Sequence, residues 1–531
     1  MNIRLFLHIV CLISVVYKIS ALNILGIFPY PGRSHFIVYS VFLQELSRRG
    51  HNVTVISHFP EKQPRKNYHD IPLGVVAEKS QDLLPVGERS VLSHLMVALY
   101  LTSSGSDNCE TLLANEKVRS LVKKEQKFDV IFVELFNNDC GYGLAYKLKA
   151  PVVAITSHIL MPWHYKRFGI PNNPSYVSYH FLEGGTKPTL YQRITRLIHG
   201  TIYNSLYRWI VQRNNQATLA KYYDDIPPLE ELGSQAKFVL LYQHYSLTGS
   251  ILYPANVIEV GGYHVAKPKQ LTGDLKQFVE GAESGIIYVS FGSMAKVSDM
   301  PQKYLESILG AFQKFPQRFI WRWDDTSMDK PQIAALPKDL KDLLTNKSKL
   351  YIANWLPQLD ILAHPKTLAF FSHAGMGSTV EAIHFGVPMV AMAIFGDQPA
   401  NAAAVKESGL GVQIAVNELS KEVVITALQK VLEPTFKAQV KELSKIWHDR
   451  PQTPMDTVVY WTEYAARSTN HTFRTAAADV PFYQYIYLDV TCIFVIFLVV
   501  NILIIKFFLF LCRRSNKQMN VKSSNKKQKK K

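Results

Sequence analysis

The chain has few of the residues that build metal sites and disulfide frameworks. Five cysteines occur in 531 residues, and Cys11, Cys492 and Cys512 lie in or beside two long hydrophobic segments. Only Cys109 and Cys140 remain in the body of the chain. They can form one disulfide in an oxidising compartment, although their spacing does not require it. No cysteine–histidine cluster has zinc spacing, so no metal site is expected.

Charged residues are also scarce. Lys, Arg, Asp and Glu make up 19% of the chain against 47% hydrophobic residues, which leaves ample material for large cores. The length suggests more than one domain. The formal net charge is +17, but nine basic residues and no acid lie from Arg513 to the end, and without them the charge falls to +8. The body is therefore only mildly basic, and nucleic-acid binding has no support outside the tail.

Two hydrophobic segments define the expected topology. Residues 1–21 combine an early Arg4, an apolar run and small final residues, which is typical of a cleavable signal peptide. Residues 488–511 are long enough to cross a bilayer if Lys506 reaches toward the basic side. The basic tail, 512–531, then stays in the cytosol and the body is lumenal or extracellular, as in a single-pass type I protein. The dilysine-type ending favours the endoplasmic reticulum membrane, and an ordinary stop-transfer tail is the alternative.

Three Asn-x-Ser/Thr sequons, at Asn52, Asn346 and Asn470, are candidate glycosylation sites in such a compartment. Asn52 lies in a segment expected to form a buried strand. Asn346 and Asn470 are therefore the better candidates.

The order of strands and helices predicts an α/β protein with two Rossmann-like domains. The first array has a helix at 36–49 and strands near 22–28, 53–57, 129–134 and 152–155. After a linker at 261–269, a second array has a helix at 301–312 and strands near 286–290, 319–323, 350–354, 369–371 and 388–391. We expect domains at 22–260 and 261–447 that face each other across a cleft. No G-x-G-x-x-G follows the first strand, which argues against a nicotinamide-dependent oxidoreductase.

Residues 370–401 carry the strongest functional pattern, a strand, a turn of small residues, a helix, a Gly-Pro break, a strand and a polar loop. The free N–H groups at the start of the helix after Gly375 form a site for a phosphate. Asp397 and Gln398 place a carboxylate and an amide at the same sheet edge, where both can bind sugar hydroxyls. The order of these groups fits a diphosphate with a sugar beyond it.

This segment resembles the signature of the UDP-glycosyltransferase family, specifically its membrane-anchored animal type with insect-like character. The matching residues are, in order, Ser372, His373, Gly375, Glu381, Gly386, Pro388, Asp397 and Gln398. Two positions depart from the pattern: Ala393, where the family usually has proline, and Gly377, where it often has asparagine. The resemblance covers nearly the whole chain and implies the GT-B architecture. Its C-terminal domain would bind the UDP-sugar, its N-terminal domain the acceptor, and residues 448–487 would return to the N-terminal domain.

The resemblance also implies a donor site. Trp355 would stack on uracil while Gln358 reaches the ribose or the base edge. Glu381 would accept hydrogen bonds from the ribose, and His373 would contact a phosphate oxygen. The whole expected set is Ser293, Arg322, Trp355, Gln358, His373, Gly375, Gly377, Ser378, Glu381, Asp397 and Gln398.

The expected general base is His35, which lies where the first strand passes into the first helix. A histidine takes a proton from a hydroxyl near neutral pH and is a stronger base with a carboxylate on its other nitrogen. Two candidates for that carboxylate follow the strand at 129–134. Matching back from Cys140 favours Glu134, whereas matching the residue type favours Asp139. We favour Asp139 and keep Glu134 as the alternative.

The implied reaction is inverting transfer of a hexose from a UDP-sugar to a hydroxyl of a small acceptor. We expect glucose, with glucuronate as the alternative. Neither a resident cofactor nor a metal is expected, because no carboxylate cluster or D-x-D-like pattern lies near the cleft. The aromatic and apolar stretch at 83–252 favours small lipophilic acceptors.

The other expected partner is the lipid bilayer, with nucleic acid excluded and a homo-oligomer left open. The alternative function is that of a non-catalytic membrane protein that binds a UDP-sugar. The pairing of His35 with a carboxylate argues against this alternative.

Overall fold

The structure is a computed structural model of the whole chain and describes residues 21–74, 91–182, 184–292, 296–324, 330–468 and 473–528, apart from some side chains near the start of α3 and the end of α22. The expected signal peptide therefore lies outside the described residues, except for Ala21. The chain forms two compact units, Met1–Arg474 and Thr475–Lys531. Each unit is described by itself.

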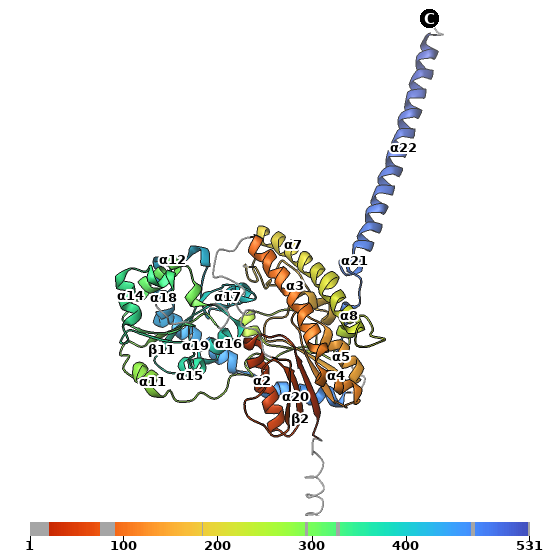
Figure 1. Cartoon of the computed structure of the whole chain (residues 1–531). Helices are drawn as coiled ribbons and strands as arrows, with labels where there is room; N and C mark the ends of the chain where they lie inside the picture. The colour runs from red at the N-terminus through yellow and green to blue at the C-terminus, as the bar shows by residue number, and fades with distance from the viewer. Residues whose placement is uncertain are drawn as a thin grey trace, which may run out of the picture. The chain divides into compact units, whose positions relative to one another are not determined.

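The first unit contains two parallel sheets (Figure 1). Among the described residues, the N-terminal sheet has seven strands in the order β3-β2-β1-β4-β5-β6-β7. Its strands are runs of buried apolar residues because helices cover both faces of a parallel sheet. Their bounds are β1 (Asn23–Phe28), β2 (Asn52–Ser57), β3 (Tyr68–Pro72), β4 (Val130–Glu134), β5 (Val152–Ile155), β6 (Val239–Leu241) and β7 (Val257–Glu259).

The C-terminal sheet has six strands among the described residues, in the order β10-β9-β8-β11-β12-β13. They are β8 (Ile286–Ser290), β9 (Arg318–Arg322), β10 (Leu350–Ala353), β11 (Thr367–Ser372), β12 (Met389–Met392) and β13 (Gly411–Ile414). In both sheets the strand order reverses next to the first strand, between β1 and β4 and between β8 and β11. These are the two positions where doubly wound sheets bind ligands.

The helices of the N-terminal domain connect its strands and form an extra layer after β5 (Figure 1). They are α2 (Arg33–Arg48), α3 (Val91–Ala114), α4 (Glu116–Lys123), α5 (Cys140–Leu148), α6 (Tyr165–Phe168), α7 (Leu190–Leu206), η3 (Tyr207–Gln212), α8 (Arg213–Ala220), α9 (Leu229–Ser234) and α10 (Tyr245–Thr248). A capping box at Thr189 and Gln192 begins α7. A disulfide between Cys109 and Cys140 joins α3 to α5 and answers the question that the sequence left open.

The C-terminal domain begins after a linker from Val260 to Thr272. Its helices are α11 (Gly273–Glu280), α12 (Gln302–Phe312), α13 (Pro331–Ala334), α14 (Lys338–Thr345), α15 (Gln358–Leu362), α16 (Met376–Phe385), α17 (Gln398–Glu407), α18 (Lys421–Leu432) and α19 (Pro434–His448). The helix α16 ends at Gly386, whose positive φ of 64° forms a left-handed C-cap.

The chain then returns to the N-terminal domain through α20 (Pro454–Arg467), which lies among the first elements of the chain in Figure 1. Asp456 accepts a hydrogen bond from Arg49 at 2.6 Å, and Ser468 O accepts one from Lys237 Nζ at 2.7 Å. The core side of α20 is apolar, with Val458 and Val459 buried. The two sheets are thus tied together by the linker and by this returning helix.

The second unit contains α21 (Phe482–Tyr485) and α22 (Leu488–Gln528). Among the described residues, α22 is the one helix long and apolar enough to cross a membrane, with a mean hydropathy of 3.0 over its most apolar stretch. It continues as a helix beyond residue 511 into the basic tail. No glycine or proline interrupts the sequence there, and Lys and Arg are good helix formers.

Candidate active site

A cavity of about 610 Å³ lies between the two sheets, beyond the carboxyl ends of β1, β4, β8 and β11. That is the edge where open α/β sheets bind ligands, and the volume suits a small-molecule site. The cavity brings together His35 from the N-terminal domain and the described members of the expected donor set, Arg322, Trp355, Gln358, His373, Gly375, Gly377, Ser378, Glu381, Asp397 and Gln398. Ser293 lies outside the described residues.

His35 and Glu134 form the first polar pair of this site. His35 lies in the first turn of α2, and its Nδ1 is 2.9 Å from Oε1 of Glu134, the last residue of β4. The histidine side chain is 19% exposed and the glutamate side chain 3%. Because a carboxylate accepts, Nδ1 carries the proton and donates. The Nε2 of His35 then has a lone pair available to a ligand in the cavity.

Asp139, which the sequence analysis favoured as the partner of His35, is engaged elsewhere, so that expectation is corrected. Its two carboxylate oxygens accept from Arg167 Nη1 at 2.8 Å and Nη2 at 2.5 Å, and Gln212 Nε2 donates at 2.9 Å. Burial alone would raise its pKa, but the charge and hydrogen bonds of Arg167 outweigh burial and hold the pKa below its ordinary value. The residue type gave the wrong assignment, because Asp139 is paired with the buried Arg167, and the local sequence does not indicate that pairing.

The acceptor side of the cavity is aromatic. The rings of Tyr30, Phe136 and His158 surround His35 with centroid distances of 4.7, 4.9 and 5.3 Å. His158 Nδ1 lies 2.6 Å from the carbonyl oxygen of Ile159, so Nδ1 must donate. Burial lowers the pKa of His158 well below its usual value, so its ring is neutral and Nε2 holds a lone pair. Among the described residues this Nε2 has no hydrogen-bond partner.

The expected phosphate site lies at the start of α16. Gly375 is the N-cap, and Met376, Gly377 and Ser378 begin the helix, so their N–H groups are free of helical partners. His373 lies directly before this turn, and burial lowers its pKa to about 4, which leaves a neutral ring.

The ring of His373 fits between two glycines. A Cβ on Gly292 would lie 2.4 Å from its Nε2, and a Cβ on Gly375 would lie 2.6 Å from the same atom. Around Gly377, by contrast, a Cβ would meet nothing within 4 Å. The turn is therefore tight on the side of His373 and open above Gly377.

Glu381 is the centre of a hydrogen-bond network across the domains. Its Oε1 lies 3.1 Å from His264 Nε2, and its Oε2 accepts from Gln358 Nε2 at 2.6 Å. Tyr242, at the end of β6, bonds to Nδ1 of the same histidine. Gln358 also donates to Ser378 Oγ at 3.0 Å. The carboxylate expected to bind ribose is thus held in place from both domains.

Trp355 presents its indole to the cavity and is 60% exposed. Two guanidinium groups lie over its ring, Arg33 at 5.1 Å and Arg322 at 5.6 Å from the centroid. Burial lowers the pKa of Arg322. An exposed indole with two cations near its ring offers an aromatic surface with positive charge close by, which suits an anionic aromatic ligand such as a nucleotide.

The polar loop after β12 is organised by Gln398. Its Oε1 accepts from the backbone N–H groups of Ile394 and Phe395 at 2.8 and 2.9 Å, so the oxygen shapes the loop. Asp397 accepts from Asn401 Nδ2 at 2.8 Å, and burial raises its pKa. The loop therefore presents the Asp397 carboxylate to the cavity from a fixed position.

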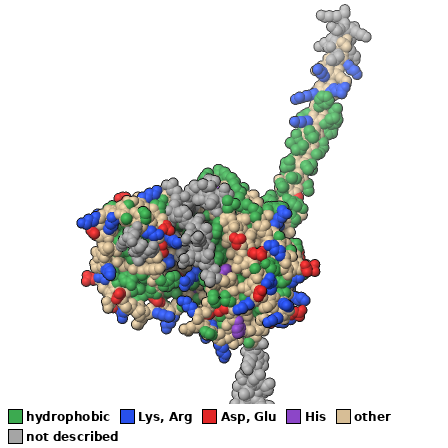
Figure 2. Space-filling model, in the orientation of Figure 1, with side chains coloured by type: hydrophobic (Ala, Val, Ile, Leu, Met, Phe, Trp, Pro, Cys, Tyr) green, Lys and Arg blue, Asp and Glu red, His purple; other side chains and the backbone are tan. Residues whose placement is uncertain are grey.

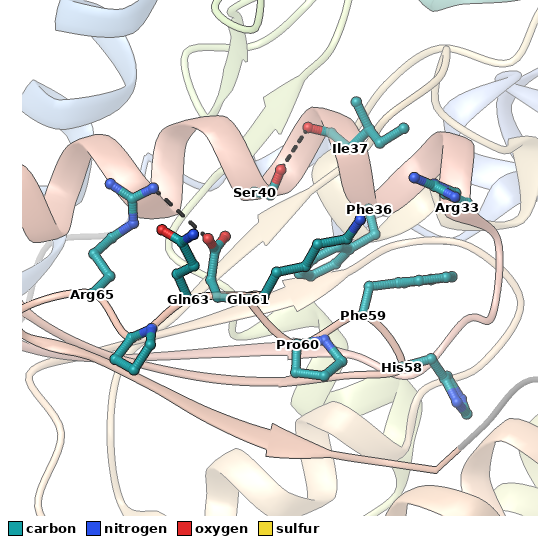
Figure 3. Close-up of a pocket in the computed structure, with 12 residues that line it drawn as sticks. Arg33, Phe36, Ile37, Ser40, His58, Phe59, Pro60, Glu61, Gln63 and Arg65 are labelled. Carbon is teal, nitrogen blue, oxygen red and sulfur yellow. Dashed lines mark hydrogen bonds and ion pairs between the residues drawn. The ribbon is translucent and has the colours of Figure 1, made fainter. Parts of the chain in front are cut away.

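A second hollow of about 900 Å³ lies beside the cleft, between α2 and residues 58–65 (Figure 3). It shares Arg33 and Ile37 with the first cavity, and its wall of residues 58–65 contains an ion pair of Arg65 with Glu61. None of the expected site residues lines this hollow, so the smaller cavity is the candidate active site.

The remaining expected positions are peripheral. Asn346 is exposed at the end of α14, and its side chain accepts from Ser348. Asn52 begins β2 and donates to Asn23 at 3.0 Å, while Asn470 lies outside the described residues. Among the residues that the structure describes, no group of three or more His, Cys, Asp or Glu side chains is arranged to hold a metal ion.

Sequence reasoning missed three residues of the site, Arg33, His158 and His264. Arg33 is two residues before His35, and His158 follows β5 at the same sheet edge, so position relative to the strands would have indicated both. His264 lies in the linker, where nothing in the local sequence predicts contact with Glu381, 117 residues away.

Comparison with known proteins agrees with this geometry. The family model "UDP-glucoronosyl and UDP-glucosyl transferase" matches residues 27–522. UDP-glucosyltransferase 2 of Dactylopius coccus is 30% identical over 498 residues, covering 91% of this chain and 92% of that protein. UDP-glucuronosyltransferase 2B14 of Oryctolagus cuniculus is 30% identical over 496 residues, covering 87% and 89%.

Solved structures support the fold. A UDP-glucosyltransferase from Polygonum tinctorium superposes with a TM-score of 0.58 at 16% identity, covering 85% of this chain and 100% of that one. TcCGT1 in complex with UDP gives a TM-score of 0.55 at 17% identity, covering 84% and 99%. The expected GT-B arrangement is confirmed. The chain belongs to the UDP-glucuronosyl and UDP-glucosyl transferase family and is a UDP-glycosyltransferase.

Proposed function

We propose that the chain transfers glucose from UDP-glucose, with inversion, to a hydroxyl of a small lipophilic acceptor, and that His35 is the general base. The observation that carries the proposal is the His35–Glu134 pair in the cavity that also contains the start of α16. Glu134 holds the proton on Nδ1, so Nε2 is the atom that takes the proton of the acceptor hydroxyl.

The transfer is a single displacement. As the acceptor O–H gives its proton to His35 Nε2, the oxygen forms a bond to the anomeric carbon of the sugar. The bond from that carbon to the diphosphate oxygen breaks, and its electron pair leaves with UDP. The negative charge on the diphosphate is stabilised by the N–H groups at the start of α16, directly after His373.

No metal ion is required in this proposal, because fixed donors at the helix start meet the charge that develops. Uracil is expected on the Trp355 platform, the ribose at Glu381 and the transferred sugar at Asp397 and Gln398. Ser293 is expected to meet a phosphate or the sugar.

The sugar is proposed to be glucose because the buried Asp397 carboxylate favours neutral hydroxyls over a second carboxylate. The Dactylopius coccus relative is named a glucosyltransferase, which supports the same choice. The acceptor is proposed to be lipophilic because Tyr30, Phe136 and neighbouring apolar side chains line the wall around His35.

The protein is proposed to be a type I protein of the endoplasmic reticulum, with lumenal catalytic domains, an N-terminal signal peptide, a span within α22 and a cytosolic tail. The apolar stretch of α22 supports the span, and the nine basic residues from Arg513 to the end of the chain support this orientation. Of the two sequons that the structure describes, Asn52 and Asn346, the exposed Asn346 is the proposed glycosylation site.

The test uses membranes containing the full chain, labelled UDP-glucose or UDP-glucuronate, and a panel of phenols. Transfer from UDP-glucose is expected, with a loss in kcat of about 10²- to 10⁴-fold for His35→Ala. Ser40→Ala, further along α2, is the matched control and keeps full activity. Full transfer by the His35→Ala protein would refute the mechanism, and transfer only from UDP-glucuronate would refute the choice of sugar. UDP binding without turnover by the wild type would make the protein a binding module.

A further inference from the structure

Arg33 lines the cavity, but the proposed reaction gives it no role. It lies in the first turn of α2, two residues before His35, and it is exposed. Among the described residues its guanidinium forms no ion pair or hydrogen bond, and it lies over the indole of Trp355 with Cζ 5.1 Å from the ring centroid. Figure 3 shows Arg33 at the start of α2, away from the pair of Arg65 with Glu61. The contact that holds this arginine is therefore an aromatic ring and not an acid.

The charge around Arg33 is unlike that of the outer surface. On the visible face of the first unit, basic and acidic side chains lie among one another (Figure 2). Arg33 instead shares its indole with a second cation, Arg322, whose guanidinium is 5.6 Å from the same ring centroid. Burial is the main cause that lowers the pKa of Arg322, and the charge of Arg33 lowers it further. Two like charges beside one exposed ring repel each other, which favours a ligand that separates or neutralises them.

The contact of Arg33 with Trp355 joins the two domains across the cavity. Arg33 belongs to the N-terminal domain, whereas Trp355 follows β10 in the C-terminal domain, and both residues line the cavity. The indole is 60% exposed, so the contact leaves much of the ring available to a ligand. Arg322 ends β9 and belongs to the same domain as Trp355. Arg33 is thus the cation that approaches the ring from the domain of the general base.

The spacing of the two groups suits a flat ligand that enters between them. Guanidinium and indole planes both stack on nucleobases. Flat groups in contact lie about 3.5 Å apart, so a base between the two would separate them by about 7 Å. From its present 5.1 Å, the Arg33 guanidinium has to move outward by only about 2 Å. A long, exposed side chain moves that far by changing its rotamer.

The proposed phosphate site is connected to Arg322 and not to Arg33. Arg322 donates to the carbonyl oxygen of Gly292, and a Cβ on Gly292 would lie 2.4 Å from Nε2 of His373, directly before α16. Among the described residues, no hydrogen bond or ion pair links Arg33 to the start of α16. The two cations therefore have different places in the donor site. Arg322 lies toward the diphosphate, and Arg33 lies over the ring that is proposed to stack on uracil.

We propose that Arg33 closes the uracil site from the N-terminal domain, so that the base of the UDP-sugar stacks between the Trp355 indole and the Arg33 guanidinium. This rests on the proposed placement of uracil on Trp355. Arg33 and His35 share the first turn of α2. A bound base therefore also holds the turn that carries the proposed general base, and donor binding helps to position His35 for the acceptor.

The test compares UDP with uridine, which has the base but no phosphate. Isothermal titration of the full chain in detergent gives the Kd for UDP, and displacement of UDP by uridine gives the Kd for uridine. Arg33→Gln is expected to raise both values by a similar factor, about 2- to 30-fold, because both ligands carry the base. Arg33→Lys keeps the charge but has no plane to stack, so it should lose nearly as much affinity. The effects of Arg33→Gln and Trp355→Ala should be non-additive, since both side chains contact one base.

Arg65→Gln, which changes an exposed arginine of the neighbouring hollow, is the matched control and should leave both Kd values unchanged. Weaker binding of UDP but not of uridine, or full recovery in Arg33→Lys, would overturn the inference in favour of an ion pair with the diphosphate. Unchanged or tighter binding of both ligands by Arg33→Gln would overturn it as well. If Trp355→Ala binds uridine as the wild type does, the placement of uracil is refuted. A wild type that binds no UDP would refute the proposed function itself.

Discussion

Two carboxylates that lie five residues apart after one strand have different roles. Glu134 ends β4 and bonds to His35, whereas Asp139 is the N-cap of α5 and is buried against Arg167. Each acid is nearly inaccessible to solvent, so neither burial nor residue type separates them. They differ in the side chain that lies opposite: the His35 ring faces Glu134, and the Arg167 guanidinium of α6 faces Asp139.

Changing Glu134 to Gln is expected to lower kcat with little change in stability. The amide is isosteric, but it no longer holds the proton on His35 Nδ1, so the base loses its orientation and tautomer. We expect a fall of about 10²- to 10⁴-fold in kcat. Steady-state rates and thermal unfolding of the same preparation measure both quantities. A Glu134→Gln enzyme with wild-type kcat would contradict the role of this carboxylate.

Changing Asp139 to Asn is expected to lower the stability of the protein with little direct effect on kcat. It leaves the Arg167 guanidinium buried with only Glu230 as an acidic partner, which typically costs about 3–5 kcal/mol. Because the pKa of Asp139 is held below its ordinary value, this acid stabilises the folded protein above that value, and the contribution is lost as pH falls toward the lowered pKa. Denaturant unfolding from pH 7 to 3 should show a weaker acid dependence for the variant. Equal acid dependence would refute the assignment.

His158 offers a test of the acceptor side. The Nε2 of its neutral ring can accept a hydrogen bond and lies next to His35. We therefore expect it to bind an O–H or N–H group of the acceptor substrate. His158→Phe should raise the acceptor KM up to about tenfold, as loss of one hydrogen bond implies, with kcat and the UDP-sugar KM unchanged. His158→Gln, which keeps an acceptor atom, should restore much of the affinity. An unchanged acceptor KM in His158→Phe would exclude the contact.

At the scale of single elements, the start of α16 is decided by how closely side chains approach its glycines. A Cβ on Gly375 would collide with His373, whereas a Cβ on Gly377 would meet open space. Gly375→Ala is expected to lower the free energy of unfolding by about 1–3 kcal/mol, as overpacking does. Gly377→Ala should be neutral or stabilising by up to about 1 kcal/mol, since alanine favours a helix interior.

Denaturant unfolding of the two glycine variants measures this difference, and isothermal titration with UDP adds a second readout. If a phosphate of UDP approaches the Gly377 backbone, the Gly377→Ala protein should bind UDP more weakly although its fold is intact. Equal stability losses in the two variants would contradict the packing of His373 between the glycines.

The elements themselves were largely predictable from the sequence. Continuous apolar runs such as residues 286–290 became buried parallel strands, because a strand covered on both faces has no polar side. The strands β3, β6, β7 and β13 were missed since each is short or contains polar residues, for example Tyr68–Pro72 with His69 exposed. That the proposed donor residues from His373 to Gln398 line one cavity was predictable, because they lie close together in sequence around α16. The partner of His35 was not, because it depends on the long-range pairing of Asp139 with Arg167.

At the scale of the whole molecule, the two domains are connected by hydrogen bonds at the Glu381 carboxylate. His264 comes from the linker, accepts from Tyr242 of the N-terminal sheet through Nδ1 and donates to Glu381 of α16 through Nε2. A second bridge joins the domains where Glu407 of α17 accepts from the backbone and hydroxyl of Thr186 at 2.9 and 2.8 Å. The position of Glu381, the acid proposed to bind the ribose, thus depends on how the domains are held together.

Changing His264 to Ala is expected to weaken UDP binding. Glu381 then keeps only Gln358 as a partner, and one charge-assisted hydrogen bond that orients it is lost. We expect a rise in the Kd for UDP of roughly 5- to 20-fold, with kcat at saturating UDP-sugar changed much less. Isothermal titration with UDP and steady-state kinetics on the full chain measure the two quantities.

Tyr242→Phe separates two explanations for such a loss. It removes the hydroxyl that bonds to His264 Nδ1 but leaves the contact of Nε2 with Glu381, so the donor carboxylate keeps its partner. If the N-terminal sheet helps to fix the ribose site, Tyr242→Phe should also raise the Kd, by less than His264→Ala, and the double variant should show non-additive effects because the residues form one chain. If the Kd stays unchanged in both single variants, Glu381 is oriented by Gln358 alone and the link between the domains does not contribute to UDP binding.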